Sequence, residues 1–376
     1  MLINPIPVLH LIKSLGRGGA ETLLVETLTA HNQEKFNFHY LYFLPWKNQL
    51  VAEIELSGGI VSNVPAVNNL RIIFQFNTII RYIRKHNIQI IHCHLPWAGF
   101  LGRLLHFKTG IPVIYSEHNK QERYHFLTRF INKLTFNAQS LAIAVSEDVK
   151  LSIKKHINPQ IPIITILNGI NLHKFKRNTE SGLKIRNELG IEPDAPVIGY
   201  LGVFRIQKRI DCWLELFAKL YSIHPSIRGI LVGDGPLKNV VIAKRKLLGL
   251  EDVVFLPGIQ TNTVDWYSAM DIFMMTSAFE GLPLSLLEAM SCECAVVSTN
   301  AGGIKEVIVN NKNGFTVDVD QWSELSHHCN DLITDQTLLK SLAKSAHSSV
   351  NDKFNIDTMV AQLESLYTKH AHSRKY

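Results

Sequence analysis

The sequence lacks the features that mark membrane-spanning, secreted or disulfide-linked proteins. None of its 376 residues belongs to an apolar run of about 18 or more, so no segment is expected to span a bilayer. The segment Met1–Ile12 carries no basic n-region, which argues against a secretory signal peptide. The five cysteines are odd in number and scattered, and Cys292-x-Cys294 is not a usual zinc spacing. We therefore expect reduced thiols in a cytoplasmic protein.

An excess of acidic residues is also missing, and the basic excess lies in one half of the chain. The net charge is +7; residues 1–173 hold 17 Lys and Arg against 9 Asp and Glu, whereas residues 174–376 hold 22 against 23. A basic half suits a phosphorylated ligand, an anionic membrane surface or nucleic acid, unless it is a solvated surface with a chance asymmetry. No module with base-stacking aromatics is recognisable, so we do not expect nucleic acid as a partner.

Apolar, β-branched runs alternate with stretches of helical period along the whole chain, and no short repeat or low-complexity tract occurs. This alternation predicts parallel sheets with helices on both faces. The polar stretch Asn171–Pro196 interrupts it, so we expect two Rossmann-like domains: residues 1–173, a linker at 174–196, residues 197–355, and a terminal helix and tail at 356–376 that packs back on the first domain. The predicted strands are Val8–Ile12, Phe38–Leu44, Ile60–Val64, Ile88–His92, Val113–Glu117, Leu141–Val145 and Ile163–Ile166, then Val197–Leu201, Gly229–Val232, Val253–Leu256, Ile272–Met275, Ala295–Ser298 and Phe315–Val317.

The segment SAFEGLPLSLLEAM (277–290) gives the strongest indication of chemistry. It follows a predicted strand, at the sheet edge where parallel sheets bind their ligands. Gly281 permits a tight turn, and Pro283 suits the first position of a helix from Leu284 to about Cys292. The free N–H groups at the start of that helix favour a phosphate.

Two carboxylates, Glu280 and Glu288, accompany this helix. Glu288 has almost only apolar neighbours, so its charge needs a specific partner. The alternative interpretation makes Glu280 a helix-capping acid and Glu288 an exposed helix residue. We favour a functional role for the pair.

A basic loop follows the first strand of the second half. In FRIQKRID (204–211), Arg205 offers a planar fork and Lys208 a point charge, which together suit a departing diphosphate. A basic loop that merely opens a helix is the alternative. The turn GRGGAE (16–21) places Gly18 and Gly19 after the first strand, where backbone approaches a ligand closely or simply turns.

Three histidines lie near the ends of predicted strands in the first half. His118 follows the strand Val113–Glu117, and a hydrogen bond from its ring to a ligand is the favoured role, a buried core histidine the alternative. His92 and His94 follow the apolar run Ile88–Ile91, but no Asp, Glu or Cys framework completes a metal site with them. We predict no metal.

Together these motifs resemble the retaining glycosyltransferase family 4, whose GT-B fold consists of two Rossmann-like domains facing each other across a cleft. The likeness covers nearly the whole chain. Its most specific part is the glutamate pair in EGLPLSLLEAM, followed by VVSTNAGGIKEVI (296–308). The order and spacing of further motifs support it: GRGGAE, IIHCH, SEHN, AVSEDV, LNGIN, FRIQKRID and GDGPLK.

The resemblance implies a role for each candidate residue. Glu288 would bind the ribose of the nucleotide, and Glu280 the donor sugar. Arg205 and Lys208 would hold the diphosphate, so that no metal or cofactor is required. The donor site would be completed by backbone and side-chain groups shared between the domains: Gly18, Gly19, Gly281, Leu282, Pro283 and Leu284, with His118 near the reacting carbon. One departure is that Val203 stands where the family has an arginine, and Arg205 would replace it.

These observations predict a glycosyltransferase that moves a sugar, with retention, from a UDP-sugar to a hydroxyl of a lipid-linked or cell-surface saccharide. A nucleotide-sugar epimerase of the same fold and a catalytically inactive nucleotide-sugar-binding subunit are the alternatives. We expect the protein at the inner face of the cytoplasmic membrane. Two basic, apolar stretches, Gln121–Asn137 and Arg71–Lys85, are typical of helices that lie on an anionic membrane, unless they pack their apolar faces on the first sheet.

Overall fold

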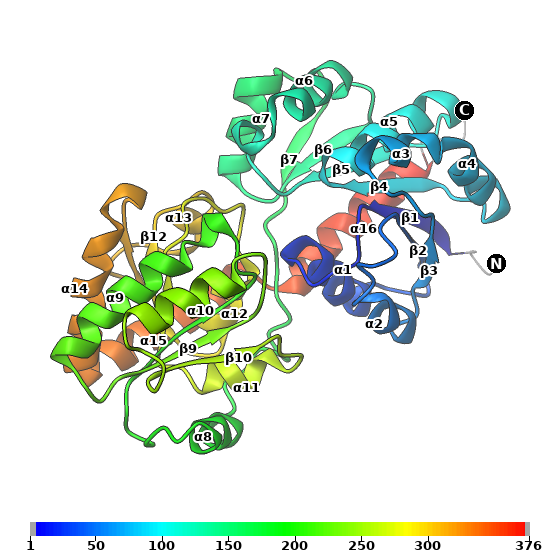
Figure 1. The fold of residues 1–376 in the computed structure, drawn as a ribbon. Coiled ribbons are helices and arrows are strands. Elements are labelled where there is room, and N and C mark those ends of the chain that lie inside the picture. Colours follow the sequence, from blue (N-terminus) through cyan, green and yellow to red (C-terminus); the bar gives the residue numbers. More distant parts are fainter. Residues whose placement is uncertain (1–4, 373–376) are drawn as a thin grey trace. The chain divides into compact units, whose positions relative to one another are not determined.

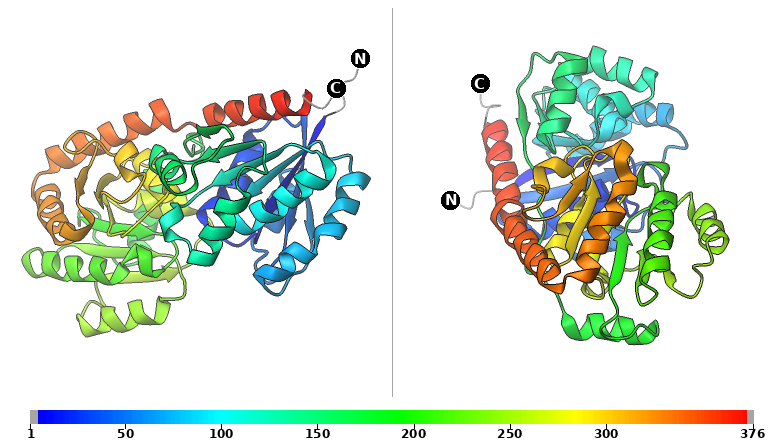
Figure 2. Two further views of the ribbon diagram at one scale, coloured as in Figure 1. Left: turned by 90° about the horizontal axis from the view of Figure 1, so that it is seen from above. Right: turned by 90° about the vertical axis from the view of Figure 1, so that its left-hand side faces the viewer.

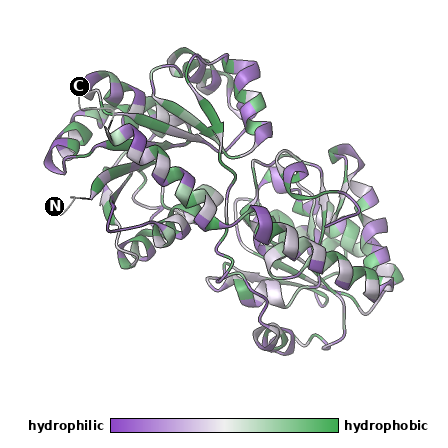
Figure 3. Cartoon of the chain, turned by 180° about the vertical axis from the view of Figure 1, so that it is seen from behind, coloured by the Kyte–Doolittle hydropathy of each residue, from purple (hydrophilic) through white to green (hydrophobic). Residues whose placement is uncertain are grey.

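The computed structural model describes residues 5–372, and the chain divides into two compact units (Figure 1). Unit 1 comprises Met1–Gly169 and Ile356–Tyr376, and unit 2 comprises Ile170–Asn355. Each unit is an α/β domain with one parallel sheet, as the sequence predicts. Figure 3 shows the strands of both units as predominantly hydrophobic, which is typical of sheets buried on both faces.

The sheet of unit 1 has seven strands in the order β3-β2-β1-β4-β5-β6-β7. Its order reverses between β1 and β4, which creates the switch point at which such sheets bind ligands. The strands are β1 (Ile6–Ile12), β2 (Phe36–Tyr42), β3 (Ile60–Asn63), β4 (Ile90–His94), β5 (Val113–Glu117), β6 (Leu141–Ala144) and β7 (Ile163–Thr165). The helices are α1 (Gly19–Ala30), α2 (Val51–Leu56), α3 (Asn69–Phe74), α4 (Phe76–Lys85), α5 (Leu95–Thr109), η1 (Gln121–Arg123), α6 (Phe126–Thr135), α7 (Glu147–Ile157) and α16 (Ile356–His372).

The sheet of unit 2 has six strands in the order β10-β9-β8-β11-β12-β13, with its switch point between β8 and β11. The strands are β8 (Val197–Leu201), β9 (Arg228–Val232), β10 (Val254–Gly258), β11 (Ile272–Met275), β12 (Ala295–Thr299) and β13 (Phe315–Val317). The helices are α8 (Thr179–Glu188), η2 (Ile206–Lys208), α9 (Ile210–Ile223), α10 (Lys238–Leu247), α11 (Thr263–Ser268), α12 (Leu284–Ser291), α13 (Ile304–Val307), η3 (Val319–Glu324), α14 (Leu325–Thr334) and α15 (Gln336–Lys353). Every predicted strand is present, with ends that differ by at most two residues.

The segment expected to be a linker, residues 174–196, has structure of its own within unit 2. It contains α8, and the buried guanidinium of Arg186 on that helix donates to the Asp271 carboxylate at 2.7 Å and to the Ala269 carbonyl at 3.0 Å. These bonds attach α8 to the start of β11. The polar composition of the segment therefore reflects a surface helix that is fixed by one buried cation.

The C-terminal helix α16 belongs to unit 1. It contacts α1, β1 and β4, and Figure 2 shows it as the red helix on one side of this sheet. Tyr367 of α16 is fully buried, and its hydroxyl bonds His92 Nδ1 at 2.7 Å. On the other face of β4, Cys93 meets Gly102 of α5, where a Cβ would lie 2.2 Å from its sulfur. The alternation along β4 therefore points His92 and His94 toward α16 and Cys93 toward α5.

Candidate functional site

Several backbone hydrogen bonds join the loops at the carboxyl edge of the unit 2 sheet. Phe204 N donates to Asp234 O at 2.9 Å and links the loops after β8 and β9. Ala278 N donates to Gln207 O at 2.7 Å and links the loops after β11 and β8. A third bond, from Gly303 N to the Gly281 carbonyl at 2.9 Å, adds the loop after β12. The edge is thus a connected frame, which holds side chains for a ligand before the ligand arrives.

Close backbone approach at two glycines makes this frame possible. Gly302 has φ +62°, and a Cβ there would lie 2.0 Å from the Glu280 carbonyl oxygen. Gly233 has φ +133°, and a Cβ there would lie 2.0 Å from the Gly202 carbonyl oxygen. Any side chain at either position would push the loops apart.

Lys208 and Glu280 form an ion pair at this edge. Lys208 Nζ lies 2.6 Å from Glu280 Oε1, and the side chains are 16% and 9% exposed. Ser277 Oγ donates to the same carboxylate oxygen at 2.6 Å. Arg205 is exposed beside this pair in sequence, whereas Arg209 binds the backbone carbonyls of Thr276 and Val319. The edge thus holds the partly shielded Lys208 next to a carboxylate, with Arg205 exposed to solvent nearby in sequence.

The other glutamate, Glu288, lies inside α12 and is buried to 8% exposure. Its Oε2 accepts a hydrogen bond of 2.7 Å from the hydroxyl of the fully buried Tyr267. Burial, together with the Glu288 charge, raises the pKa of Tyr267 well above its usual value, so the phenol stays a donor. The sequence required a partner for Glu288 but did not identify Tyr267, which belongs to another helix. Pro283 is the residue preceding α12 and not its first helical residue, a shift of one position.

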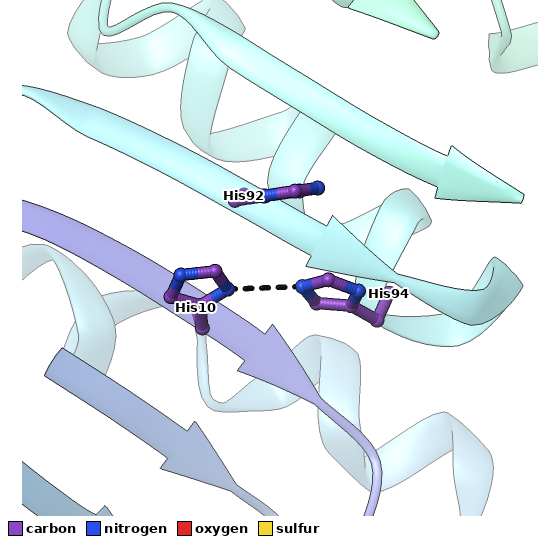
Figure 4. A group of neighbouring side chains, drawn as sticks. All are labelled: His10, His92 and His94. Atoms are coloured by element: carbon purple, nitrogen blue, oxygen red, sulfur yellow. Dashed lines mark hydrogen bonds between the residues drawn. The ribbon is translucent and has the colours of Figure 1, made fainter. Parts of the chain in front are cut away.

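The carboxyl edge of unit 1 carries imidazoles. His10 of β1 lies in register with His92 of β4, and His94 is two residues further along β4. His10 Nδ1 and His94 Nε2 are 3.0 Å apart (Figure 4), and His94 Nδ1 is 3.4 Å from Nε2 of His118, which follows β5. The predicted strand Ile88–His92 ends two residues too early, because β4 extends to His94. His10 was not singled out, since only the strand register brings it here.

These imidazoles stay uncharged at neutral pH. Burial lowers the pKa of His10, His92 and His94 well below the ordinary value, and their mutual repulsion lowers it further. Burial also lowers the pKa of the partly exposed His118, to about 4. A small cavity of about 20 Å³ is lined by all four rings. This edge therefore offers neutral hydrogen-bonding groups.

The predicted glycine turn lies at the start of α1 in the same unit. Gly18 immediately precedes the helix and Gly19 is its first residue. A Cβ at Gly19 would meet no atom within 4 Å, so the backbone is open on this side of the helix start, whereas a Cβ at Gly18 would lie 2.4 Å from a carboxylate oxygen of Glu21.

Helix α6 turns its polar side inward. The buried Arg103 of α5 donates to Asn132 Oδ1 at 2.8 Å and to Thr135 Oγ1 at 2.9 Å, both on α6. Its Nε donates to Gln139 Oε1 at 2.9 Å. A buried guanidinium needs such partners, and supplying them fixes which side of α6 faces the protein. The large apolar residues of α6 are consequently exposed: Phe126 (68%), Leu127 (50%), Phe130 (58%) and Leu134 (68%).

Helix α4 shows the opposite arrangement. Its Ile79, Ile80 and Ile83 are buried. Of the two stretches that the sequence predicts to lie on a membrane, Arg71–Lys85 forms α3 and α4; α4 packs its apolar face inward and Phe74 of α3 is exposed, whereas α6 has four exposed large apolar residues. No helix in residues 5–372 is both long and apolar enough to cross a bilayer.

Comparison with known proteins agrees with this fold and identifies the family. Residues 183–349 match the family model described as "Glycosyl transferases group 1", and residues 17–174 match "Glycosyltransferase Family 4". Similar curated proteins include "N-acetyl-alpha-D-glucosaminyl L-malate synthase" of Bacillus anthracis, 29% identical over 76% of this chain and 75% of that protein. Another is "UDP-Gal:alpha-D-GlcNAc-diphosphoundecaprenol alpha-1,3-galactosyltransferase" of Escherichia coli, 25% identical over 77% and 78%. Among solved structures, Anabaena Alr3699/HepE in complex with UDP and glucose superimposes with a TM-score of 0.87 at 21% identity, covering 97% and 100%, which shows the GT-B fold.

Proposed function

Because this chain belongs to the group 1 glycosyltransferases, we propose that it transfers a sugar from a UDP-sugar to a hydroxyl of a lipid-linked or cell-surface saccharide, with retention of configuration. The observation that carries the proposal is the edge of unit 2. There Glu288 is buried on a tyrosine donor, and Lys208 is paired with Glu280 at the switch point of the sheet. This edge combines groups for a ribose, a diphosphate and a sugar.

Each side chain then has a task. Glu288 accepts hydrogen bonds from the ribose hydroxyls. Lys208 and Arg205 neutralise the diphosphate as it leaves, and the N–H groups at the start of α12, with Gly281, Leu282, Pro283 and Leu284, lie along the phosphates and the sugar. When a diphosphate attracts Lys208, Glu280 keeps the Ser277 hydroxyl as a partner and turns its charge to the sugar hydroxyls.

The carboxyl edge of the unit 1 sheet, with its uncharged histidines, binds the donor sugar in this proposal. His118 donates a hydrogen bond to an oxygen near the reacting carbon, and the backbone at Gly18 and Gly19 approaches the donor closely. An uncharged imidazole suits a sugar hydroxyl, because it orients the oxygen without adding charge beside the diphosphate.

The names of the relatives support the donor and the stereochemistry. The Escherichia coli relative is named for UDP-Gal and an alpha-1,3 linkage, and the Bacillus anthracis relative for an alpha-D-glucosaminyl product. Since UDP-galactose carries its sugar in the alpha configuration, an alpha product retains it. The first of these names also contains a diphosphoundecaprenol acceptor, which motivates a lipid-linked acceptor here.

The test supplies UDP-glucose, UDP-galactose and UDP-N-acetylglucosamine, each with and without a polyprenyl-diphosphate-linked saccharide. We expect one donor to be consumed only when acceptor is present, and the anomeric proton coupling of the product to show an alpha linkage. A beta linkage would refute retention. Conversion of the donor to another sugar nucleotide without acceptor would instead establish the epimerase.

We also assign the exposed face of α6 to an anionic membrane that carries the acceptor. Phe126, Phe130 and Leu134 point outward on a helix flanked by Arg123 and carrying Arg129 and Lys133. Apolar side chains enter the headgroup boundary, and each nearby cation adds about 1 kcal/mol of attraction before screening.

Vesicle co-sedimentation tests this assignment, with α4 as the matched control. Reversing the charge of Arg123, Arg129 and Lys133 together is expected to abolish binding to phosphatidylglycerol-containing vesicles at low salt. The same reversal on α4, at its exposed cations Arg81, Arg84 and Lys85, should preserve most of it. Equal losses in both triple variants, or no binding by the wild type, would rule out α6 as the contact.

A further inference from the structure

We infer that His10 and His94 are positioning residues: through a chain of ring-to-ring hydrogen bonds they fix the proton of His118 on its Nδ1 atom. The chain runs His10 Nδ1···Nε2 His94 at 3.0 Å and His94 Nδ1···Nε2 His118 at 3.4 Å. Its inner end is closed, since His10 Nε2 is buried and makes no hydrogen bond within residues 5–372. Its outer end is open, since His118 Nδ1 makes none there either and the ring is partly exposed.

Neutral imidazoles allow only two arrangements of this chain. Each ring carries one N–H and one lone pair, so a donor at one nitrogen requires an acceptor at the other. If His10 donates from Nδ1, His94 donates in turn to His118 Nε2, and the His118 proton sits on Nδ1. If the direction is reversed, the His118 proton sits on Nε2 and His10 carries its proton on the closed Nε2 atom. The low pKa values of the three rings keep both arrangements uncharged.

The closed end decides between them. In the reversed arrangement, His10 Nε2 is a buried N–H without an acceptor, and orphaned N–H groups are rarer in protein interiors than orphaned acceptors. The rings that flank His10 accept no hydrogen bond from this atom: Tyr40 stacks on the imidazole at 4.9 Å and Phe38 lies 5.7 Å away. The forward arrangement leaves only a lone pair there. His118 is therefore preset as an Nδ1–H donor.

A metal ion is the competing occupant, because ligand nitrogens of His10, His92 and His94 lie within 4.8 Å of one another. A zinc ion needs lone pairs that converge on one point about 2.0–2.1 Å away. In Figure 4 the nitrogens of His10 and His94 point at each other, and their ring planes are only 18° apart, as in an N–H···N bond. Both nitrogens of His92 are already bonded, to Tyr367 at 2.7 Å and to Ser116 at 2.8 Å.

The consequence for the reaction rests on the proposed function. An oxygen of the donor sugar beside His118 meets a donor whose direction is set before binding, so no proton has to be rearranged when the ligand arrives. Without the chain, His118 populates both tautomers, and the molecules with a lone pair at Nδ1 do not donate.

The experiment reads the protons directly. Full-length protein labelled with ¹⁵N in its histidines gives, in long-range ¹H–¹⁵N spectra at pH 7.5, the protonated nitrogen of each ring; His118→Gln assigns the His118 signals. We expect Nδ1–H in the wild type and in His10→Asn, whose amide N–H replaces the Nδ1 donor. His10→Phe should give a mixture of tautomers and lower kcat roughly tenfold, with little change in donor KM. The matched control Tyr367→Phe, which removes a hydrogen bond from His92 only, should leave His118 unchanged.

Three results would overturn the inference. They are an Nε2–H tautomer of His118 in the wild type, a His118 spectrum unaffected by His10→Phe, and stoichiometric zinc whose removal by a chelator shifts the His10 and His94 resonances. The wild-type spectrum decides even if His10→Phe does not fold. If the spectra agree but no sugar is transferred to any acceptor, the proton chain stands and the proposed function fails.

Discussion

The two units share a topology but present opposite kinds of chemistry at equivalent edges. In both, the strand order reverses beside the first strand, between β1 and β4 and between β8 and β11. Unit 2 keeps Lys208, Glu280 and Glu288 there and stabilises them by pairing and hydrogen bonds. Unit 1 keeps histidines there and holds them neutral by burial. The difference teaches that the shared topology determines where a ligand can bind. The side chains at each edge then determine whether a charged or an uncharged part of the ligand binds there.

The contrast between the two units would be lost if the positive charge of Lys208 at the unit 2 edge proved dispensable for catalysis. Lys208→Met should lower kcat by roughly 10²–10³-fold, because a preorganised cation no longer meets the departing diphosphate. Lys238→Met is the matched control, since Lys238 also forms an ion pair, with Asp234 at 2.7 Å, but is 49% exposed. Its kcat should stay within about twofold of the wild type. Steady-state kinetics with saturating acceptor measure both, and equal losses would deny Lys208 its role.

A second test separates binding from turnover within unit 2. Glu288→Gln keeps the size of the side chain but removes the charge that accepts from ribose hydroxyls, so the Kd for UDP should rise roughly 10–100-fold. Glu293→Gln, an exposed glutamate just beyond the same helix, should leave it unchanged. Isothermal titration with UDP distinguishes them. Unchanged affinity in Glu288→Gln would move the nucleotide away from α12.

The uncharged histidines at the carboxyl edge of the unit 1 sheet predict that unit 1 loses more folding stability in acid than unit 2 does. A buried histidine whose pKa is lowered in the fold takes up its proton only on unfolding. The free energy of unfolding is therefore highest above about pH 6.5, the pKa of an unfolded histidine. Below that pH it falls by up to about 1.4 kcal/mol per pH unit for each such ring. His10, His92 and His94 contribute in this sense, and Glu117, whose pKa burial raises, opposes them at lower pH.

Unit 2 has much less of this sensitivity, because no histidine in residues 170–355 is buried, and His328, whose pKa desolvation lowers, is only partly buried. Hydrogen exchange followed by mass spectrometry at pH 7.5 and pH 5.5, corrected for the intrinsic exchange rate, reports on each unit separately. Protection of β1 and β4 should fall more than that of β8 and β11. An equal fall would mean that the imidazoles are not held neutral.

The sequence was sufficient for the strands and for placing Glu280 before and Glu288 inside one helix, because both depend on local pattern. A buried parallel strand is a short apolar run, and Glu280 and Glu288 stand eight residues apart around one helix start. The contacts of His10 and Tyr267 could not be predicted from the sequence. Strand register pairs His10 with His92, and a neighbouring helix brings Tyr267 to Glu288. No local pattern records such contacts.

The direction of α6 was likewise beyond local pattern. Its amphipathic sequence predicts a helix with an apolar face, and burial of that face is the usual outcome. The partners required by the buried Arg103 decide otherwise, and they come from Asn132, Thr135 and Gln139, about 30 residues or more away in sequence. The same argument explains α8, where Arg186 and Asp271 turn a polar stretch into an ordered part of unit 2.

The smallest expected effect concerns how unit 2 stabilises the negative charge of Glu288. Tyr267→Phe removes the hydroxyl that donates to Glu288, while Tyr200→Phe removes a buried hydroxyl that makes no hydrogen bond within residues 5–372. Both tyrosines are buried in the same unit, at 0% and 1% exposure, so the packing change is matched. A bond to a carboxylate is worth about 1.5–3 kcal/mol, so Tyr267→Phe should destabilise unit 2 by about that much and weaken UDP binding several-fold. Tyr200→Phe should be neutral or slightly stabilising, because an unsatisfied hydroxyl is lost. Urea unfolding of both variants, with UDP titration of each, measures the two outcomes. If the variants destabilise unit 2 equally, Glu288 does not depend on Tyr267, and its charge must be held by other contacts.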